Sequence, residues 1–256
     1  MLQNKIKKRL SRGQPVFGAF VTQPSVGVAK LLAADGLDWL MIDMEHGLID
    51  TPSMHAMVTA IANASCTPLV RTPLSAHGVI ENALDAGAHG LVFPTISTVA
   101  QADATVRAMH YPPKGTRGWG PYYASAQWGV SPADYYDAAR NELLNVVLIE
   151  QKGALDALDD ILAVSGIDVV GIAPGDLSVS LGHPGNREHP EVLEVIREIE
   201  RKVLASGRAL GGVALSPEET NRKVAAGYRF LFLGADVTFL KRAVAGALEG
   251  VVREVT

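Results

Sequence analysis

The amino-acid sequence predicts an α/β protein built as a (β/α)8 TIM barrel, and three observations lead to that prediction. At five places a helix-like stretch ends in Gly, and a short apolar run follows almost at once. Gly just beyond a helix supplies the left-handed position that ends it, so each place is a tight connection from a helix to a strand. The 256 residues accommodate eight such βα units, which is typical of the barrel. A doubly wound open sheet competes, but no G-x-G-x-x-G motif opens the first unit.

Each expected strand is a short apolar run, and each is followed by an amphipathic stretch with helical spacing. The strands are Val16–Phe20, Trp39–Ile42, Pro68–Arg71, Leu91–Phe93, Val146–Ile149, Val169–Ile172, Leu210–Val213 and Phe230–Leu233. The helices are Val26–Ala34, Met54–Ala64, Val79–Ala86, Ala100–Met109, Ala154–Ala163, Val192–Ala205, Glu218–Ala226 and Phe239–Val252. The five helix-ending glycines are Gly36, Gly87, Gly166, Gly207 and Gly227. Because no linker interrupts this series, we expect residues 1–256 to form one domain.

One irregular segment, Tyr111–Gly129, separates the fourth helix from the fifth strand. Its Pro, Gly and aromatic content argues against a helix. Loops of this length inside a compact domain are usually functional. We expect this segment to be a lid or a contact between subunits.

Composition and charge argue against several classes of function. The formal net charge of −4 provides no basic surface for nucleic acid, and no apolar run approaches the length of a membrane span. We expect no secretory signal, because the basic N-terminal residues are not followed by an apolar segment. The single cysteine, Cys66, rules out disulfides within the chain and Cys-rich metal sites, and it fits a cytoplasmic location.

Charged residues follow four of the predicted strands at their carboxyl ends, where barrel enzymes place their chemistry. Asp43-Met44-Glu45-His46 follows the second strand, and Arg71 ends the third. Glu150 comes directly after the fifth, and Asp176 stands just beyond the sixth. We therefore expect these side chains to meet at one mouth of the barrel.

Glu150 and Asp176 follow adjacent parallel strands, which lie roughly 5 Å apart in a sheet. Two carboxylates at that distance repel unless one is protonated or a cation lies between them. With no Cys and few His nearby, such an oxygen-rich site suits Mg²⁺ or Mn²⁺ and also accepts Co²⁺. The structural alternative is that Asp176 caps the following helix while Glu150 forms only a salt bridge.

An α-keto acid would bind such a metal through its carboxylate and keto oxygen. Arg71 would then face the negative charge that develops on the keto oxygen. Backbone N–H groups in the segment Ala173-Pro174-Gly175-Asp176 would receive the carboxylate. Alternatively, Arg71 pairs structurally with Asp43 or Glu45.

His46 has acidic neighbours, Asp43 and Glu45, that would orient the imidazole and raise its basicity. We expect it to move protons. No predicted strand core contains the Lys that a Schiff-base aldolase needs, and Lys152 is interpreted as a loop residue. The remaining histidines show no ligand spacing and receive no role: His55, His77, His89, His110, His183 and His189.

With these residues in place, the chain resembles the metal-dependent, class II pyruvate aldolases of the 4-hydroxy-2-oxoheptanedioate aldolase family. That family includes the 2-keto-3-deoxy-rhamnonate and 5-keto-4-deoxy-glucarate aldolases. The similarity extends from Gly18 to Leu240. The motifs that carry it are Asp43-Met44-Glu45-His46, Val70-Arg71-Thr72, Tyr111-Pro112-Pro113-Lys114-Gly115-Thr116-Arg117-Gly118, Ile149-Glu150 and Pro174-Gly175-Asp176-Leu177-Ser178.

The resemblance implies a barrel of the phosphoenolpyruvate-binding type, assembled as a homo-hexamer, a trimer of dimers that exchange their last helix. It implies that Glu150 and Asp176 ligate the metal and that Arg71 stabilises a pyruvate enolate. The implied reaction is the reversible cleavage of a 4-hydroxy-2-oxo acid into pyruvate and an aldehyde.

The resemblance also implies acid-base chemistry by His46. Asp43 matches the family pattern, and Asp85 matches an acidic residue that reaches this histidine network from a neighbouring subunit. In this sequence alone, Asp85 is only part of a helix end.

Three positions depart from the family pattern. Leu148 stands where many members have Gln, Gln151 follows Glu150 where Thr or Ser is usual, and Ala173 replaces a common Gly. These changes leave the ligands in place but affect the expected pocket. Alternatives that keep the same site are oxaloacetate decarboxylation and acyl-CoA thioester cleavage, and a further alternative is a non-catalytic barrel that binds a keto acid.

Overall fold

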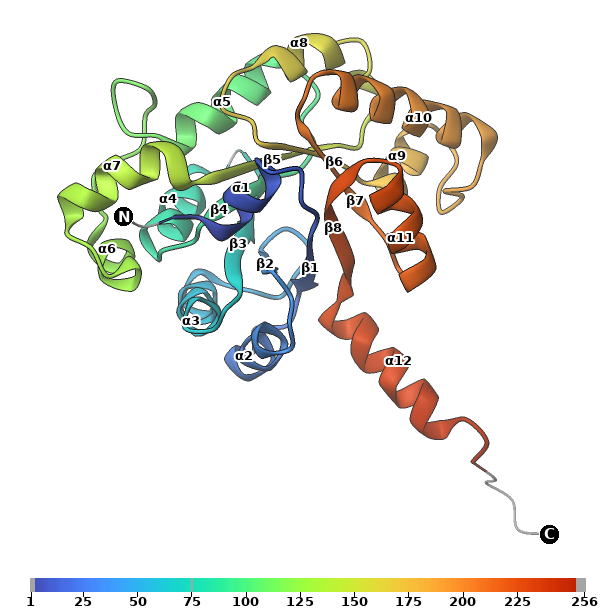
Figure 1. Cartoon of the computed structure of the whole chain (residues 1–256), viewed down its shortest axis with the longest axis horizontal. Coiled ribbons are helices and arrows are strands. Elements are labelled where there is room, and N and C mark those ends of the chain that lie inside the picture. The colour runs from blue at the N-terminus through green and yellow to red at the C-terminus, as the bar shows by residue number, and fades with distance from the viewer. Residues whose placement is uncertain (1–2, 75, 252–256) are drawn as a thin grey trace.

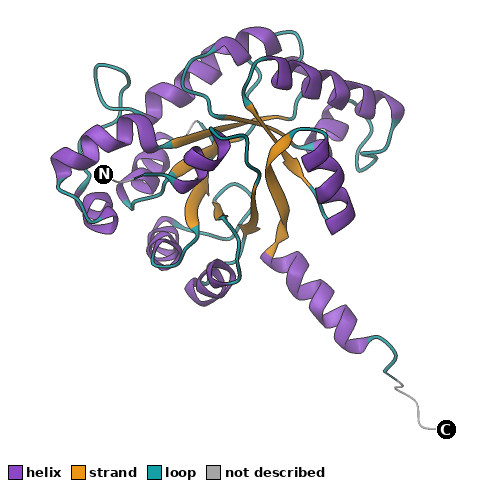
Figure 2. Ribbon diagram, in the orientation of Figure 1, coloured by secondary structure: helices purple, strands orange, loops and turns teal. Residues whose placement is uncertain are grey.

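The computed structural model describes residues 3–74 and 76–251, and it forms a closed barrel of eight parallel strands in sequence order. The helices surround this barrel (Figure 1, Figure 2). The strands are β1 (Val16–Val21), β2 (Trp39–Asp43), β3 (Thr67–Arg71), β4 (Gly90–Phe93), β5 (Leu144–Ile149), β6 (Val169–Ile172), β7 (Ala209–Val213) and β8 (Tyr228–Ala235). All eight predicted strands are confirmed.

The helices are α1 (Lys5–Leu10), α2 (Val26–Ala34), α3 (Thr51–Ala62), α4 (His77–Asp85), α5 (Val99–Met109), α6 (Tyr122–Trp128), α7 (Pro132–Glu142), α8 (Leu158–Ala163), α9 (Pro174–Ser180), α10 (Pro190–Ala205), α11 (Pro217–Ala225) and α12 (Asp236–Leu248). The five glycines predicted to end helices all have positive φ, between 74° at Gly207 and 103° at Gly227. The predicted helix Ala154–Ala163 is divided into a short 3-10 turn, Lys152–Ala154, and α8. The last residue of the final predicted helix, Val252, lies outside the described residues. No helix in the described ranges is long and apolar enough to cross a membrane.

The interior of the barrel is filled by one inward-facing residue in every two along each strand. Trp39 is fully buried there and stacks on Phe230, with ring centroids 4.3 Å apart. Gly18 makes room for this ring, because a Cβ at Gly18 would lie 2.1 Å from Trp39. A second apolar layer lies between the outer faces of the strands and the helices.

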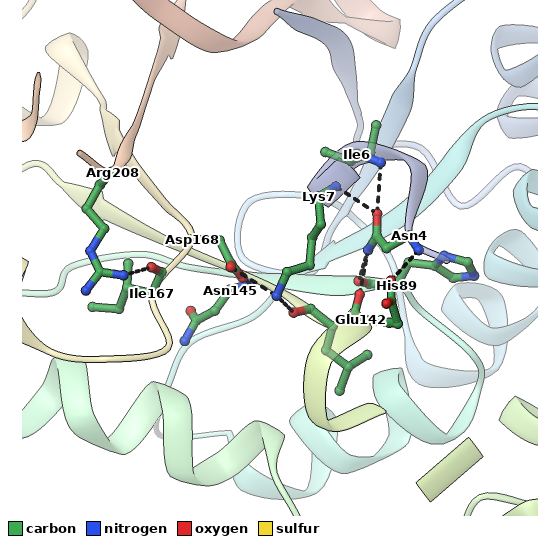
Figure 3. A network of polar contacts seen from close by, with 10 residues as sticks. Asn4, Ile6, Lys7, His89, Glu142, Asn145, Ile167, Asp168 and Arg208 are labelled. Atoms are coloured by element: carbon green, nitrogen blue, oxygen red, sulfur yellow. Dashed lines mark hydrogen bonds and ion pairs between the residues drawn. The ribbon is translucent and has the colours of Figure 1, made fainter. Parts of the chain in front are cut away.

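The amino-terminal end of the barrel is closed by α1, whose Ile6 packs into the interior cluster. Asn4 caps α1 by accepting from the Ile6 N–H at 3.0 Å, and its amide donates to the carbonyls of His89 and Glu142 at 2.9 and 2.8 Å. Lys7 pairs with Asp168 at 3.0 Å. These residues form the polar network of Figure 3, which seals this end of the barrel.

The prediction that Tyr111–Gly129 contains no helix is wrong, because α6 lies within it. Tertiary contacts support this short helix: Trp128 is buried and donates to the Gly87 carbonyl at 2.9 Å, and Gly129 ends the helix with φ 66°. The segment connects α5 to β5, so it lies at the amino-terminal ends of the strands. It is therefore not a lid over the mouth of its own barrel, and its role as a subunit contact stays a prediction.

Candidate active site

The alternation of side chains along the strands carries three charged residues to the top of the barrel interior. Trp39 and Met41 point inward on β2, and Asp43 continues their series. Arg71 follows the inward-facing Leu69 on β3, and it pairs in register with Asp43. Glu150 continues the series of Val146 and Leu148 on β5. Because the side-chain period of a strand is two, all three face the same mouth.

Arg71 is held by two carboxylates. Its Nε donates to Asp43 Oδ1 at 2.9 Å and its Nη2 to Asp43 Oδ2 at 2.6 Å, while Nη1 lies 3.2 Å from Glu45 Oε2. The guanidinium also lies over the Phe20 ring, 5.2 Å from its centroid. The pairing with Asp43 and Glu45, given above as the structural alternative, is thus present at the mouth itself, and it fixes the orientation of the guanidinium.

Burial and pairing act in opposite directions on these groups. Burial raises the pKa of Asp43, but the hydrogen bond and charge of Arg71 outweigh it, so this pKa lies below its usual value. Burial lowers the pKa of Arg71, but the bond to Asp43 and the charges of Asp43 and Glu45 hold it above its usual value. Both groups are therefore charged at neutral pH.

Glu150 has the opposite environment. It is buried, and burial raises its pKa to about 7, with further contributions from the charges of Asp176 and Glu45. Its Oε1 accepts from the backbone N–H of Thr95 at 2.6 Å. The charged form of Glu150 is therefore disfavoured, because it is buried and lies near the carboxylate of Asp176.

Thr95 is a site residue that the sequence analysis missed. It has φ 58°, a left-handed conformation that is costly for a β-branched residue, and it is the one non-Gly residue with positive φ among those described. This conformation accompanies the N–H group that binds Glu150. Its only signal in the sequence is its place just beyond the fourth strand.

Asp176 lies in the first turn of α9, and the suggestion that it caps this helix is wrong. The residue before the helix is Ala173, and no side chain provides a capping hydrogen bond. Asp176 is exposed at the mouth, and its carboxylate forms no ion pair with the rest of the described chain. A Cβ at Gly175 would meet nothing within 4 Å, so the backbone there is open to a ligand.

His46 lies on the rim with 64% of its side chain exposed, and its Nε2 is 3.7 Å from Glu45 Oε2. Of the two acidic neighbours predicted to orient the imidazole, only Glu45 approaches it. Asp43 Oδ1 instead accepts from the backbone N–H groups of Glu45 and His46 at 3.1 and 3.2 Å.

Asp85 does not join the mouth of its own barrel. It ends α4, and its Oδ1 binds the buried Arg117 at 2.7 Å. Burial raises the pKa of Asp85, and the hydrogen bond to Arg117 opposes this rise. Within one chain, therefore, Asp85 is part of the packing of α4 against the segment after α5.

The donor groups at the mouth fit a hard divalent cation. Asp43, Glu45, Glu150 and Asp176 bring four carboxyl groups to this region, and Arg71 is the cation paired with two of them. Glu150 and Asp176 are the two that Arg71 leaves without an ion pair among the described residues. An all-oxygen pair with open surroundings matches the preference of Mg²⁺ and Mn²⁺.

Known proteins are similar to this chain in sequence and in fold. The family model for HpcH/HpaI aldolase/citrate lyase matches residues 17–243. A hydroxypyruvate/pyruvate aldolase from Agrobacterium fabrum is 37% identical, over 92% of this chain and 89% of that protein. A 2-keto-3-deoxy-L-rhamnonate aldolase from Escherichia coli K12 is 36% identical, over 95% of this chain and 91% of that protein.

Structural comparison agrees. The crystal structure of an HpcH/HpaI aldolase/citrate lyase family protein from Burkholderia cenocepacia has a TM-score of 0.90 and 33% identity, covering 96% of this chain and 98% of that one. The predicted barrel and the predicted family resemblance are confirmed. The chain belongs to the HpcH/HpaI aldolase/citrate lyase family.

Proposed function

We propose that this protein is a divalent-metal-dependent pyruvate aldolase, which reversibly cleaves a 4-hydroxy-2-oxo acid into pyruvate and an aldehyde. The observation that carries the proposal is the meeting of charged groups at the mouth of the barrel, where the buried Glu150 accepts from the Thr95 N–H and Arg71 is held by Asp43 and Glu45. The names of the two relatives, each a pyruvate-type or keto-sugar-acid aldolase, support the same reaction class.

Glu150 and Asp176 are the proposed metal ligands. A bound Mg²⁺, Mn²⁺ or Co²⁺ would supply Lewis-acid stabilisation of negative charge on the keto oxygen. The Thr95 N–H fixes one oxygen of Glu150, so the other oxygen points to a defined place. Asp176 reaches the same region from α9, and its exposure leaves room for substrate.

Arg71 is the proposed stabiliser of the enolate. Its guanidinium is held rigidly by Asp43 and Glu45, so no reorganisation is needed as charge develops. Asp43 is then a positioning residue. The backbone around Ala173, Pro174 and Gly175 would receive the substrate carboxylate, since N–H groups in the first turn of α9 lack partners within the helix.

His46 is the proposed carrier of the proton on the C4 hydroxyl group. Its exposed position on the rim and its neighbour Glu45 suit this task. Asp85 would assist from a neighbouring subunit, as the resemblance implies. That role requires Asp85 to exchange its bond with Arg117 or to act with the oxygen that Arg117 does not hold.

The departures from the family pattern concern the pocket. Leu148 belongs to the interior apolar layer directly below Glu150, so it raises the cost of ionising that carboxyl group in the absence of metal. Gln151 is exposed, and Ala173 has φ −106°, a conformation that Ala adopts without strain. The proposed ligands are therefore unaffected.

The proposal includes a homo-oligomer built by exchange of α12, with the hexamer as the expected assembly. α12 projects away from the barrel (Figure 1), and it exposes an apolar stripe at a spacing of four residues. The stripe is Leu240, Val244 and Leu248, which are 56%, 59% and 46% exposed. At the base of α12, a groove of about 380 Å³ beside β1 and β8 is lined by apolar residues such as Phe17 and Leu233.

The occupant that fits this groove is α12 of a second copy. The double variant Leu240→Glu/Val244→Glu should then be a monomer in size-exclusion chromatography with light scattering. Lys241→Glu, which reverses a charge beside the stripe but leaves the apolar residues in place, should keep the wild-type mass. A monomeric wild-type protein would contradict the exchange.

A cytoplasmic location is the remaining part of the proposal. Cys66 is free and buried, and burial raises the pKa of its thiol to about 12. Such a thiol is unreactive and suits a reducing compartment.

The test of the chemistry is proton NMR of pyruvate in D₂O with metal-stripped protein, before and after addition of Mg²⁺ or Mn²⁺. We expect metal-dependent loss of the methyl signal as enolisation exchanges its protons. Glu150→Gln should abolish the exchange that added metal produces in the wild type. Arg71→Ala should suppress the exchange even when metal is present. Wild-type exchange rates in either variant would overturn the proposed site.

A further inference from the structure

A second group of metal-ligating side chains lies apart from the mouth, in the connection between α9 and α10. It comprises His183, His189 and Glu191, and one donor atom from each lies within 4.8 Å of the others. His183 Nε2 is 2.8 Å from Glu191 Oε2, and the two imidazole rings stack with centroids 3.4 Å apart. The spacing in sequence gave no sign of a site, so the turn creates this proximity.

The backbone fixes the two histidines. The His183 N–H donates to the Ser178 carbonyl at 2.7 Å, which ties this residue to α9. His189 is the N-cap of α10, and its Nδ1 accepts from the Glu191 N–H at 3.3 Å. Gly182 and Gly185 have φ 85° and 77°, conformations that reverse the chain between the two elements. The cluster therefore belongs to an ordered turn.

The donor set is that of a zinc site. Two imidazole nitrogens and one carboxylate oxygen are zinc ligands, and a fourth position would hold water or another ligand. Donor atoms around tetrahedral zinc are about 3.4 Å apart, so the cluster must contract slightly. One imidazole must also turn, because the nitrogen lone pairs of nearly parallel rings do not converge on one point. The half-buried His183 and the exposed Glu191 have room for this adjustment.

This group differs in chemistry from Glu150 and Asp176. Carboxylate oxygens alone suit Mg²⁺ and Mn²⁺, whereas imidazole favours Zn²⁺, Ni²⁺ and Cu²⁺. The two sites share α9: Asp176 lies in its first turn, and His183 follows its last residue by three positions. An ion held by His183 and His189 would therefore tie the end of α9 to the start of α10 and stiffen the element that carries Asp176.

We propose that His183, His189 and Glu191 form a second metal site, which takes a borderline divalent ion of the Zn²⁺ type and cross-links α9 to α10. The site is separate from the proposed aldolase chemistry. It does not require that the chain be an aldolase.

The experiment uses the full chain carrying Glu150→Gln and Asp176→Asn, which removes the carboxylate pair at the mouth. Zn²⁺ is titrated by isothermal calorimetry into this metal-stripped protein. We expect one Zn²⁺ per chain, and at least tenfold weaker binding after the addition of His183→Ala. X-ray absorption at the zinc edge should report two imidazole ligands.

Two matched variants separate ligation from folding. His189→Ser keeps a side chain that caps α10 but removes the imidazole, so it should weaken Zn²⁺ binding while the melting temperature stays unchanged. His77→Ala removes an exposed histidine that also lies near a carboxylate, at 3.6 Å from Glu81, and it should leave binding unchanged. The proposal would be overturned if the protein carrying Glu150→Gln and Asp176→Asn bound no zinc. It would also be overturned if adding His183→Ala or His189→Ser left the zinc affinity of that protein unchanged.

Discussion

The two ends of the barrel are formed by the same strands but differ in how completely their charged side chains are paired. At the amino-terminal end, Asn4 makes hydrogen bonds with both its side-chain atoms, and Lys7 and Asp168 form an ion pair. At the mouth, Arg71 is shared by Asp43 and Glu45, while Glu150 is buried with a pKa of about 7. At the closed end, Asn4, Lys7 and Asp168 find their partners within the chain, whereas at the mouth the carboxylates of Glu150 and Asp176 have no ion-pair partner among the described residues.

This difference indicates where stability and activity reside. A compensated network stabilises the fold, whereas poorly compensated carboxylates destabilise it and provide binding energy for a cation. Changes at the mouth should therefore alter activity more than stability. Changes at the closed end should do the reverse, and four predictions test this division.

The largest effect is expected for Arg71→Ala. Removing a preorganised group that faces developing charge typically lowers kcat by about 10² to 10³. The exchange of pyruvate methyl protons should fall by this factor, as measured by NMR. Arg71→Lys is the matched control: it keeps the charge but loses the two-pronged contact with Asp43, so it should recover only part of the activity. Full activity in Arg71→Ala would contradict the conclusion that the residues at the mouth determine activity.

Glu150 should make the stability of the metal-free protein depend on pH. Its folded pKa of about 7 exceeds the unfolded value of 4.5, so the folded state binds more protons between these values. Stability should fall as pH rises from about 4.5 to about 7, by about 3 kcal/mol in total. Denaturant unfolding across this range measures the fall, and Glu150→Gln should remove it. Added Mn²⁺ should restore stability at pH 8 in the wild type only.

Asn4→Ala tests the closed end. It leaves the His89 and Glu142 carbonyls without their donors and removes the cap of α1, so unfolding free energy should drop by about 2 kcal/mol. Pyruvate exchange by the folded protein should be unchanged. Asn4→Ser, which keeps a capping oxygen, should recover part of the loss. Loss of activity without loss of stability would contradict the division between the two ends.

The smallest effect is expected for Lys7→Met. The pair with Asp168 is partly exposed, with 26% and 24% of the side chains accessible, so its contribution is modest. Stability should fall by about 0.5 to 1 kcal/mol, and the difference should shrink in high salt. A loss as large as that of Asn4→Ala would show that the ion pair, rather than the cap, seals this end.

The rules that predicted the strands and helices of the barrel use only residues that are close in sequence, so the sequence alone was enough to apply them. Glycines ended the helices as expected, and strand alternation aimed Asp43, Arg71 and Glu150 into one mouth. The helix α6 was not predictable in this way, because it depends on the contact of Trp128 with Gly87. That residues 1–256 form one domain stays a prediction.

The missed site residues depend on tertiary structure. Thr95 matters because of its backbone conformation, which no residue pattern announces, and His183 meets His189 only through the geometry of a turn. Capping by Asp176 was only the structural alternative to metal binding, and it fails because α9 begins at Pro174, two residues before Asp176. The sequence therefore predicted which charged residues meet at the strand ends, and the structure shows how they are oriented.

The burial of Trp39 inside the barrel makes its intrinsic fluorescence a probe of whether the barrel is closed. Trp39 is fully buried, whereas Trp119 is 55% exposed. Emission from Trp39 should be blue-shifted and protected from quenching by acrylamide while the barrel is closed. Emission from Trp119 should be quenched by acrylamide even in the folded protein. A Trp119→Phe variant would thus leave a fluorescence signal dominated by shielded indoles, and its change on dilution out of denaturant would time the closure of the barrel around Trp39.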